Sequence, residues 1–410
     1  MPNTLANPSW VIKEVGRYWL NNIQFLKNCK RTYDDQFVQA GAKVGDTVNY
    51  RLPQKFVANS GSALQVQALY DQTVPMTLSN QTNVGFGYSS REATVNLDDI
   101  RGRYVMPAAE TLAAEADKAA FSNVYTDVYN SVGTPGTTTS TQLTYLQAGV
   151  KLTDLGTPKQ GRVGVLDPLA MATLANTSAS LFNPQALIGQ HFTEGEYRRT
   201  ALGVSEWMED SNRPLHTTGS FTAATPLVNG ANQTGSTITT DGWASAATSL
   251  KKGDILTFAG VYSVHPISKV STGRLQQFTV TADTSDSTGD IAALPISPSI
   301  ITSGALQTVS NSPADGAVIL VWAATSGGAL TATVSPTGML FVPDAFAFVT
   351  ADLAMPRGGA LAERTRSKNF GMAIRYVEQF NITTDQNLNR LDILHGSAAV
   401  RPEFACRLVG

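Results

Sequence analysis

The sequence contains few of the residues and motifs that catalytic and metal-binding sites use. Its 410 residues include two cysteines, Cys29 and Cys406, near opposite ends, and four histidines. None of them has the spacing of zinc ligands, and two thiols in a chain of this length favour a reducing compartment. The chain also lacks a G-x-S-x-G elbow and a phosphate-binding loop. The residues therefore predict no catalytic, cofactor or metal site.

Charged residues are also scarce. They make up 15% of the chain, with a net charge of −2, against about 25% in typical globular proteins. Tight binding to nucleic acid needs clustered lysines and arginines, and the near-neutral sequence offers no such cluster. A surface this poor in charge favours a protein that is covered by other subunits in an assembly.

Long apolar runs are missing as well. The N-terminus has no basic start followed by an apolar run, so we expect no secretory signal. The most apolar stretch, residues 317–334, is broken at residues 325–328 and falls short of the roughly 20 residues of a membrane span. We therefore expect a soluble protein that is made in a cytoplasm and does not contact a membrane.

Three segments have the pattern of helices. Trp10, Trp19 and other apolar residues recur at helical spacing in residues 9–30, and this segment must dock on something to bury them. Pro107 suits a first helical turn, and about 24 residues from there to Asn130 would span about 36 Å as a spine helix. A third helix is predicted to start at Asp167 and Pro168, after a buried strand.

The remaining segments favour extended structure. Residues 41–97 alternate β-branched and polar residues among glycines and asparagines, which is typical of long strands in a hairpin or loop with little core of its own. From Phe221 to about Ser335 the chain has no glutamate and is rich in threonine, serine, alanine and glycine. Its short strands at regular spacing predict an inserted β-barrel or sandwich, after which the first domain resumes and ends in strands.

The carboxylates of Asp283, Asp286 and Asp290 form the most notable acidic cluster. A glycosidase needs two carboxylates across a cleft, and a weak cation site needs several oxygens. The surrounding sequence, DTSDSTGD, is typical of a surface turn, which is our interpretation. A carbohydrate-active enzyme is the least favoured alternative.

Four segments carry a resemblance to a known family. They are Lys251–Val264, Arg162–Leu174, Thr337–Pro356 and Leu391–Gly410. Their order over nearly the whole chain resembles the major capsid proteins of tailed bacteriophages with the Hong Kong 97-like fold. The sequence is most similar to the coat proteins of the short-tailed Salmonella phage group, which carry an inserted β-barrel domain.

The resemblance implies an α+β fold and a set of domains. These would be an N-terminal arm (1–40), an extended loop (41–98), a peripheral domain with the spine helix (99–134), two parts of an axial and peripheral domain (135–221 and 336–410) and the inserted all-β barrel (222–335).

The resemblance also implies a function. The protein would be a non-enzymatic major capsid protein whose hexamers and pentamers form an icosahedral shell, enclosing double-stranded DNA without binding it specifically. Scaffolding and portal proteins would be partners, with assembly in the host bacterial cytoplasm and a final place in the virion. Some relatives cross-link a loop lysine to an asparagine, but no motif around Lys43 or Lys55 indicates this, so we expect a non-covalent shell. An encapsulin-like compartment shell and a phage tail or decoration protein remain alternatives.

Overall fold

The computed structural model describes most of the chain, and the chain divides into two compact units. The described residues are 23–31, 47–62, 64–95, 104–139, 141–179, 202–244, 248–286, 288–322, 324, 328–356, 360–366 and 372–409. Unit 1 comprises residues 1–50, 73–121 and 346–398, and unit 2 comprises residues 51–72, 122–345 and 399–410. Each unit is described by itself.

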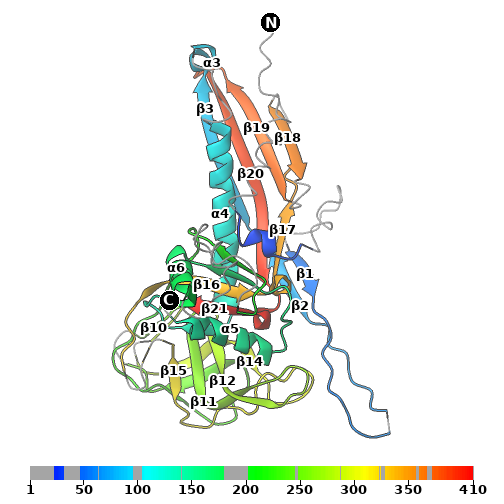
Figure 1. The fold of residues 1–410 in the computed structure, drawn as a ribbon, viewed down its shortest axis with the longest axis vertical. Coiled ribbons are helices and arrows are strands. Elements are labelled where there is room, and N and C mark those ends of the chain that lie inside the picture. Colours follow the sequence, from blue (N-terminus) through cyan, green and yellow to red (C-terminus); the bar gives the residue numbers. More distant parts are fainter. Residues whose placement is uncertain are drawn as a thin grey trace. The chain divides into compact units, whose positions relative to one another are not determined.

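Unit 1 is built on an antiparallel sheet of five strands. The strand order is β17-β20-β19-β18, and β3 also pairs with β20 (Figure 1). The longest pairing runs from Gln386 opposite Ser89 to His395 opposite Asn80. The strands are β3 (Asn80–Ser89), β17 (Phe346–Ala351), β18 (Leu361–Arg366), β19 (Ala373–Asn381) and β20 (Gln386–Ala399). A separate pair joins β1 (Thr47–Arg51) to β2 (Thr73–Thr77).

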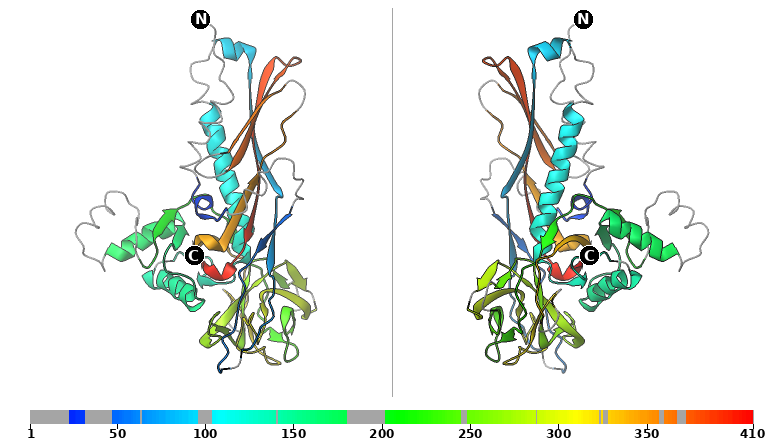
Figure 2. Two further views of the ribbon diagram at one scale, coloured as in Figure 1. Left: turned by 90° about the vertical axis from the view of Figure 1, so that its right-hand side faces the viewer. Right: turned by 90° about the vertical axis from the view of Figure 1, so that its left-hand side faces the viewer.

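The helix α4 (Met106–Val124) lies along this sheet, and the short helix α3 (Ser90–Val95) follows β3 (Figures 1 and 2). The predicted start of the spine helix is confirmed. Its predicted end at Asn130 is wrong, because α4 passes into the 3-10 turn η3 (Tyr125–Asp127). Beyond this turn the Asn130 side-chain amide donates to the Ala405 carbonyl at 3.0 Å and the chain continues as a strand.

The N-terminal part of the chain is described from Ile23. The expected helix over residues 9–30 lies mostly outside the described residues, and its last part is wrong. Instead of an α-helix, Leu26–Asn28 form the 3-10 turn η1. Lys30 then pairs in parallel with Ala347, and the chain is bound to the β17 edge by two backbone hydrogen bonds.

Unit 2 contains a second sheet with helices on one face. Its order is β4-β21-β16-β5-β6, and β7 also pairs with β16. The predicted buried strand and the helix start at Pro168 are both confirmed by β5 and α6. The elements are β4 (Ser131–Gly133), α5 (Gln142–Asp154), β5 (Val163–Leu166), α6 (Pro168–Ala179), β6 (Glu206–Glu209), β7 (Leu215–Thr217), β16 (Val334–Phe341), η4 (Pro343–Ala345), η5 (Pro402–Phe404) and β21 (Ala405–Val409).

Between β7 and β16 the chain forms a β-rich region, residues 221–330, which we call the β-module. Its sheet has the order β15-β11-β12-β14-β9-β8, with β10 and β13 as a separate pair. The two ends of this order are joined, because Val228 N–H donates to Ala317 O and Ile319 N–H donates to Pro226 O. The strands are β8 (Leu227–Val228), β9 (Gly235–Asp241), β10 (Thr248–Leu250), β11 (Ile255–Val264), β12 (Ser271–Val280), β13 (Thr284–Asp286), β14 (Ile291–Ile300) and β15 (Ile319–Val321).

Two apolar clusters stabilise unit 2. One lies inside the β-module and is centred on side chains such as Phe258, Phe278 and Leu294, all fully buried. The other lies between α5, α6 and the sheet, and it includes Trp207 and Leu340. The two clusters share no residue, so the β-module has an apolar core of its own.

Candidate interaction surfaces

The segment between β1 and β2, residues 52–72, is a long hairpin-like loop that we call the exposed loop (Figure 2). Its base is closed by Leu52 N–H, which donates to the Gln72 carbonyl at 2.9 Å. Further along, glutamine side chains provide the cross-links. The Gln67 side chain bonds both the N–H and the carbonyl of Val57, at 3.0 and 2.5 Å, and Gln54 accepts from Tyr70 N–H at 3.1 Å.

The exposed loop carries large apolar side chains into solvent. The most exposed are Leu64 at 89% and Val66 at 87%, and three others are more than half exposed, namely Phe56, Leu69 and Tyr70. Single exposed apolar residues are common on soluble proteins, but five on one segment make the exposed loop a candidate contact surface. The Lys55 ammonium lies 3.9 Å from the Glu403 carboxylate, a partly exposed pair that holds the loop only weakly.

A second apolar surface lies at the turn between β19 and β20 in unit 1. Ile382 is 87% exposed, and Phe380 and Leu388 are nearly half exposed. Phe380 lies on the same face of β19 as the buried Ile374 and Tyr376, but near the end of the strand, where its side chain is exposed. The turn is held by Ser90, whose hydroxyl donates to the Asp385 carboxylate at 2.6 Å.

The acidic cluster singled out from the sequence does not form a catalytic pair. Asp283 accepts from Lys252 N–H at 2.8 Å and from the Lys251 ammonium at 2.9 Å, and these bonds lower its pKa. Asp286 accepts from Thr288 and Gly289 and so closes a local turn. Asp290 is exposed. Among the described residues, no group of three acidic, histidine or cysteine side chains could hold a metal ion.

The histidines and cysteines have structural surroundings. His265 accepts backbone N–H groups of its own turn, and burial lowers the pKa of His395 to about 4. His191 lies outside the described residues. Both cysteines are buried free thiols, and burial raises the pKa of Cys406 to about 11 and that of Cys29 further. Thiols with raised pKa values are poor nucleophiles.

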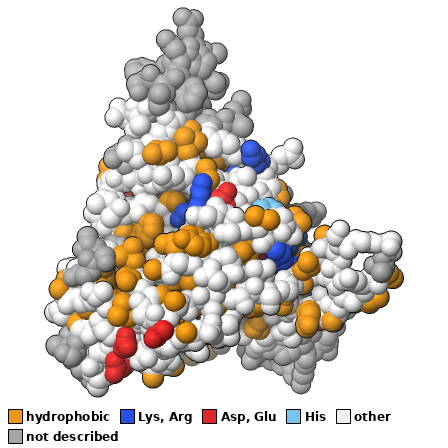
Figure 3. Space-filling model, turned by 90° about the horizontal axis from the view of Figure 1, so that it is seen from below, with side chains coloured by type: hydrophobic (Ala, Val, Ile, Leu, Met, Phe, Trp, Pro, Cys, Tyr) orange, Lys and Arg blue, Asp and Glu red, His pale blue; other side chains and the backbone are white. Residues whose placement is uncertain are grey.

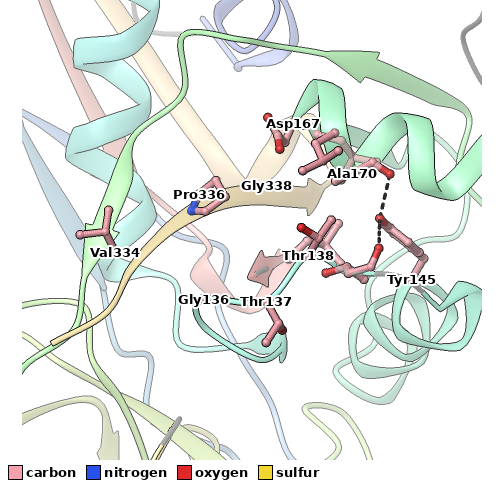
Figure 4. Close-up of a pocket in the computed structure, with 13 residues that line it drawn as sticks. Gly136, Thr137, Thr138, Tyr145, Asp167, Ala170, Val334, Pro336 and Gly338 are labelled. Carbon is pink, nitrogen blue, oxygen red and sulfur yellow. Dashed lines mark hydrogen bonds between the residues drawn. The ribbon is translucent and has the colours of Figure 1, made fainter. Parts of the chain in front are cut away.

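A cavity of about 260 Å³ lies beside α6 and β16 (Figure 4). The Tyr145 hydroxyl lies at its edge and contacts the carbonyls of Thr139 and Ala170 at 3.3 and 3.1 Å. The lining contains one carboxylate, Asp167, which is paired with Arg213 at 2.7 Å. With threonines and apolar side chains as its other walls, the cavity offers no acid–base pair.

The molecular surface is poor in charged side chains, as the composition of the chain is. Figure 3 shows a face on which apolar side chains are scattered among uncharged ones, with few charged groups. None of the described helices is long and apolar enough to span a membrane.

The family comparison identifies the class of protein. A model of the family described as P22 coat protein, gene protein 5, matches residues 11–410. The chain belongs to this family. It is therefore a major capsid protein of a tailed phage, its copies form the shell, and its place is the virion capsid. Its fold is an α+β capsid fold, as the resemblance implied.

Solved structures resemble this coat protein at low sequence identity. A chain of Mycobacterium phage Che8 is 13% identical, with 94% of this chain and 90% of that chain covered and a TM-score of 0.47. A chain of the mature capsid of bacteriophage PhiM1 is 11% identical, with 94% of this chain and 86% of that chain covered and a TM-score of 0.44. The CUS-3 coat protein I-domain is 26% identical, with 25% of this chain and 97% of that chain covered and a TM-score of 0.20. No curated protein sequence matches the chain.

Proposed function

We propose that this coat protein builds an icosahedral shell of hexamers and pentamers around double-stranded DNA, and that the exposed loop is the segment that binds a neighbouring copy. The observation that carries the proposal is the set of five large apolar side chains exposed on residues 52–72. A loop tied by a few glutamine bonds gains most of its apolar burial from another chain.

We also propose the domain assignment that the resemblance implies. The N-terminal arm is residues 1–40, the extended loop 41–98, the peripheral part with the spine helix 99–134, the axial and peripheral domain 135–221 and 336–410, and the inserted β-barrel 222–335. The separate apolar core of the β-module supports an inserted domain. The hydrogen bonds that join the two ends of its strand order support a closed barrel.

The further partners follow from the same proposal. Scaffolding and portal proteins direct assembly in the host cytoplasm, and the DNA is enclosed without specific contacts, in keeping with the net charge of −2. We propose that the subunit has a structural and not an enzymatic role, as the coat protein family suggests, and the engagement of Asp283 and Asp286 in local turns is in keeping with this.

Expression of the chain, alone and with its neighbouring genes, followed by negative-stain electron microscopy tests the shell. Closed or aberrant round shells are expected. Small monomers in both preparations would contradict the proposal.

A charge placed on the exposed loop tests its role. Val66→Asp puts a carboxylate where we expect an apolar contact, so the concentration needed for assembly should rise about tenfold or more. Gln65→Asp adds the same charge at the adjacent exposed residue and serves as the matched control. Light scattering against protein concentration measures the threshold, and circular dichroism checks that both variants are folded. Equal thresholds for the two variants would rule out the loop as the contact.

A further inference from the structure

The sheet of unit 2 packs one face against α5 and α6, and its other face carries buried polar and buried apolar residues side by side. Leu340, Cys406 and Leu408 contribute to the apolar cluster with α5 and α6. Residues directly opposite or two apart on paired strands share a face. By the registers of β4, β7, β16 and β21, the other face carries the buried apolar residues Met339, Phe341 and Val409 beside five buried polar residues. We call these five polar residues the polar face: Ser131, His216, Ser335, Thr337 and Arg407.

The β-module is bound to this polar face by hydrogen bonds of buried groups. The Arg407 guanidinium, 2% exposed, donates through Nη1 to the Gly253 carbonyl at 2.8 Å. His216 Nε2 lies 3.0 Å from Asp254 Oδ1, and its Nδ1 lies 3.3 Å from the Tyr125 hydroxyl. The other oxygen of Asp254 accepts the Gly219 N–H at 3.0 Å.

Further polar contacts surround this centre. Gln277 Oε1 accepts from Ser131 N–H at 2.9 Å and from the Lys151 ammonium at 2.6 Å. The Thr279 hydroxyl donates to the Thr126 carbonyl at 2.9 Å. Two partly exposed ion pairs lie further out, Arg274 with Asp154 and Lys252 with Asp127.

Several hydrogen-bonding groups of the polar face have no partner. Within the described part of the chain, two nitrogens of Arg407 and the hydroxyls of Ser131, Ser335 and Thr337 have no hydrogen-bond partner. Burial lowers the pKa of Arg407 to about 10, which reflects the loss of its hydration. Water would hydrate all these groups if the β-module moved away, while the two apolar clusters would stay intact because they share no residue.

We propose that the contacts of Arg407 and His216 with Gly253 and Asp254 form a polar latch, which lets the β-module leave the sheet and return as a folded body. Opening of the latch divides neither apolar cluster of unit 2, so both parts can remain folded. In a shell, it lets the β-module reorient when contacts between subunits change, and the sheet beneath keeps its geometry. The latch is a property of the single subunit and does not depend on the proposed role of the exposed loop.

Amide hydrogen exchange on the full-length, unassembled chain, read residue by residue, tests the latch. The N–H groups of Ser131 and Gly219 bond side chains of the β-module, so they report docking. The paired strands β11 and β12 report unfolding of the β-module, and β16 and β21 report unfolding of the sheet. We expect Ser131 and Gly219 to exchange at least tenfold faster than both strand pairs. Exchange of Ser131 and Gly219 at the rate of β11 and β12 would overturn the proposal.

A pair of matched variants sharpens the test. Asp254→Asn removes the carboxylate that faces His216, and it should speed the exchange of the Ser131 amide about tenfold while β11 and β12 keep their rates. Asp315→Asn alters another carboxylate of the β-module, which accepts Gly230 N–H at 2.8 Å away from the polar face, and should leave Ser131 unchanged. Acceleration of every amide by Asp254→Asn would show unfolding instead of release and would overturn the latch.

Discussion

His395 on β20 is a buried side chain whose protonation opposes folding. Its Nε2 lies 3.3 Å from the Thr82 hydroxyl on the neighbouring strand, and its ring contacts Phe348 with centroids 5.7 Å apart. Burial lowers its pKa from 6.5 to about 4. The folded chain therefore keeps this imidazole neutral over a range in which the unfolded chain binds a proton.

The pH dependence of stability follows from this difference. Above about pH 6.5 the side chain is neutral in both states and contributes no slope. As the pH falls towards 4, the unfolded state gains the proton first, so the free energy of unfolding drops by up to roughly 3 kcal/mol. Urea unfolding of the parent and of His395→Gln, between about pH 7 and pH 4.5, measures the effect. The variant should lack this part of the slope, and identical slopes would contradict the assignment.

Contacts between individual side chains that are distant in the sequence were the least predictable feature of the molecule. The composition gave no sign that His216 and Asp254 meet. Arg407 and Gly253 are 154 positions apart, and their contact arises only when β21 and the β-module come together. Periodicity within a segment carries no information about such distant pairs.

At the scale of elements, α4 fixes the start of the described chain through one buried carboxylate. Asp117, which is 4% exposed, accepts the N–H groups of Gln24, Phe25 and Leu26 at 2.7–3.3 Å. The ring of Phe25 stacks on Phe121 of the same helix at 4.6 Å. The carboxylate thus satisfies donors at the beginning of η1 that the short turn leaves open.

Removal of this carboxylate should release the segment. Asp117→Ala leaves three N–H groups without their acceptor and should lower the free energy of unfolding by roughly 2–4 kcal/mol. Tryptic cleavage at Lys27, Lys30 and Arg31 should accelerate. Glu115→Ala is the control, since Glu115 lies exposed on the same helix, 3.8 Å from Lys118, in a pair worth less than about 1 kcal/mol. Unchanged cleavage in Asp117→Ala would rule out this anchoring.

The elements themselves were predictable where local signals were strong. Asp167 and Pro168 placed the start of α6, and Pro107 placed the first turn of α4. The helix α5 was not predicted, because it buries Tyr145 and Leu152 while exposing Leu143 and Leu146, which obscures a single apolar stripe. The sequence also gave no sign of α3, a helix of six residues.

At the scale of the whole chain, two separate apolar clusters in unit 2 imply two sources of stability. The strand-rich composition of residues 221–335 predicted the β-module, and the return of the first domain after it, at β16, was predicted as well. The order of strands was not, because pairing depends on contacts between distant segments. The resemblance supplied the capsid fold, which composition alone did not specify.

Separate cores should unfold separately. Phe278→Ala removes a fully buried ring from the β-module and should lower the stability of that part by about 3–5 kcal/mol. Calorimetry should show one transition shifted down and another unchanged. Leu275→Ala on the same strand is the control, since Leu275 is 42% exposed. A single transition that moves as a whole would contradict separate cores.

The glutamine ties of the exposed loop have a consequence for the geometry of a closed shell. Identical subunits in a large shell occupy positions with slightly different local curvature. A ladder of backbone bonds has a fixed register, whereas the amides of Gln54 and Gln67 sit on rotatable side chains and can exchange one carbonyl or N–H partner for another. If the exposed loop binds a neighbouring copy as proposed, its glutamine contacts would let one sequence fit positions of different curvature.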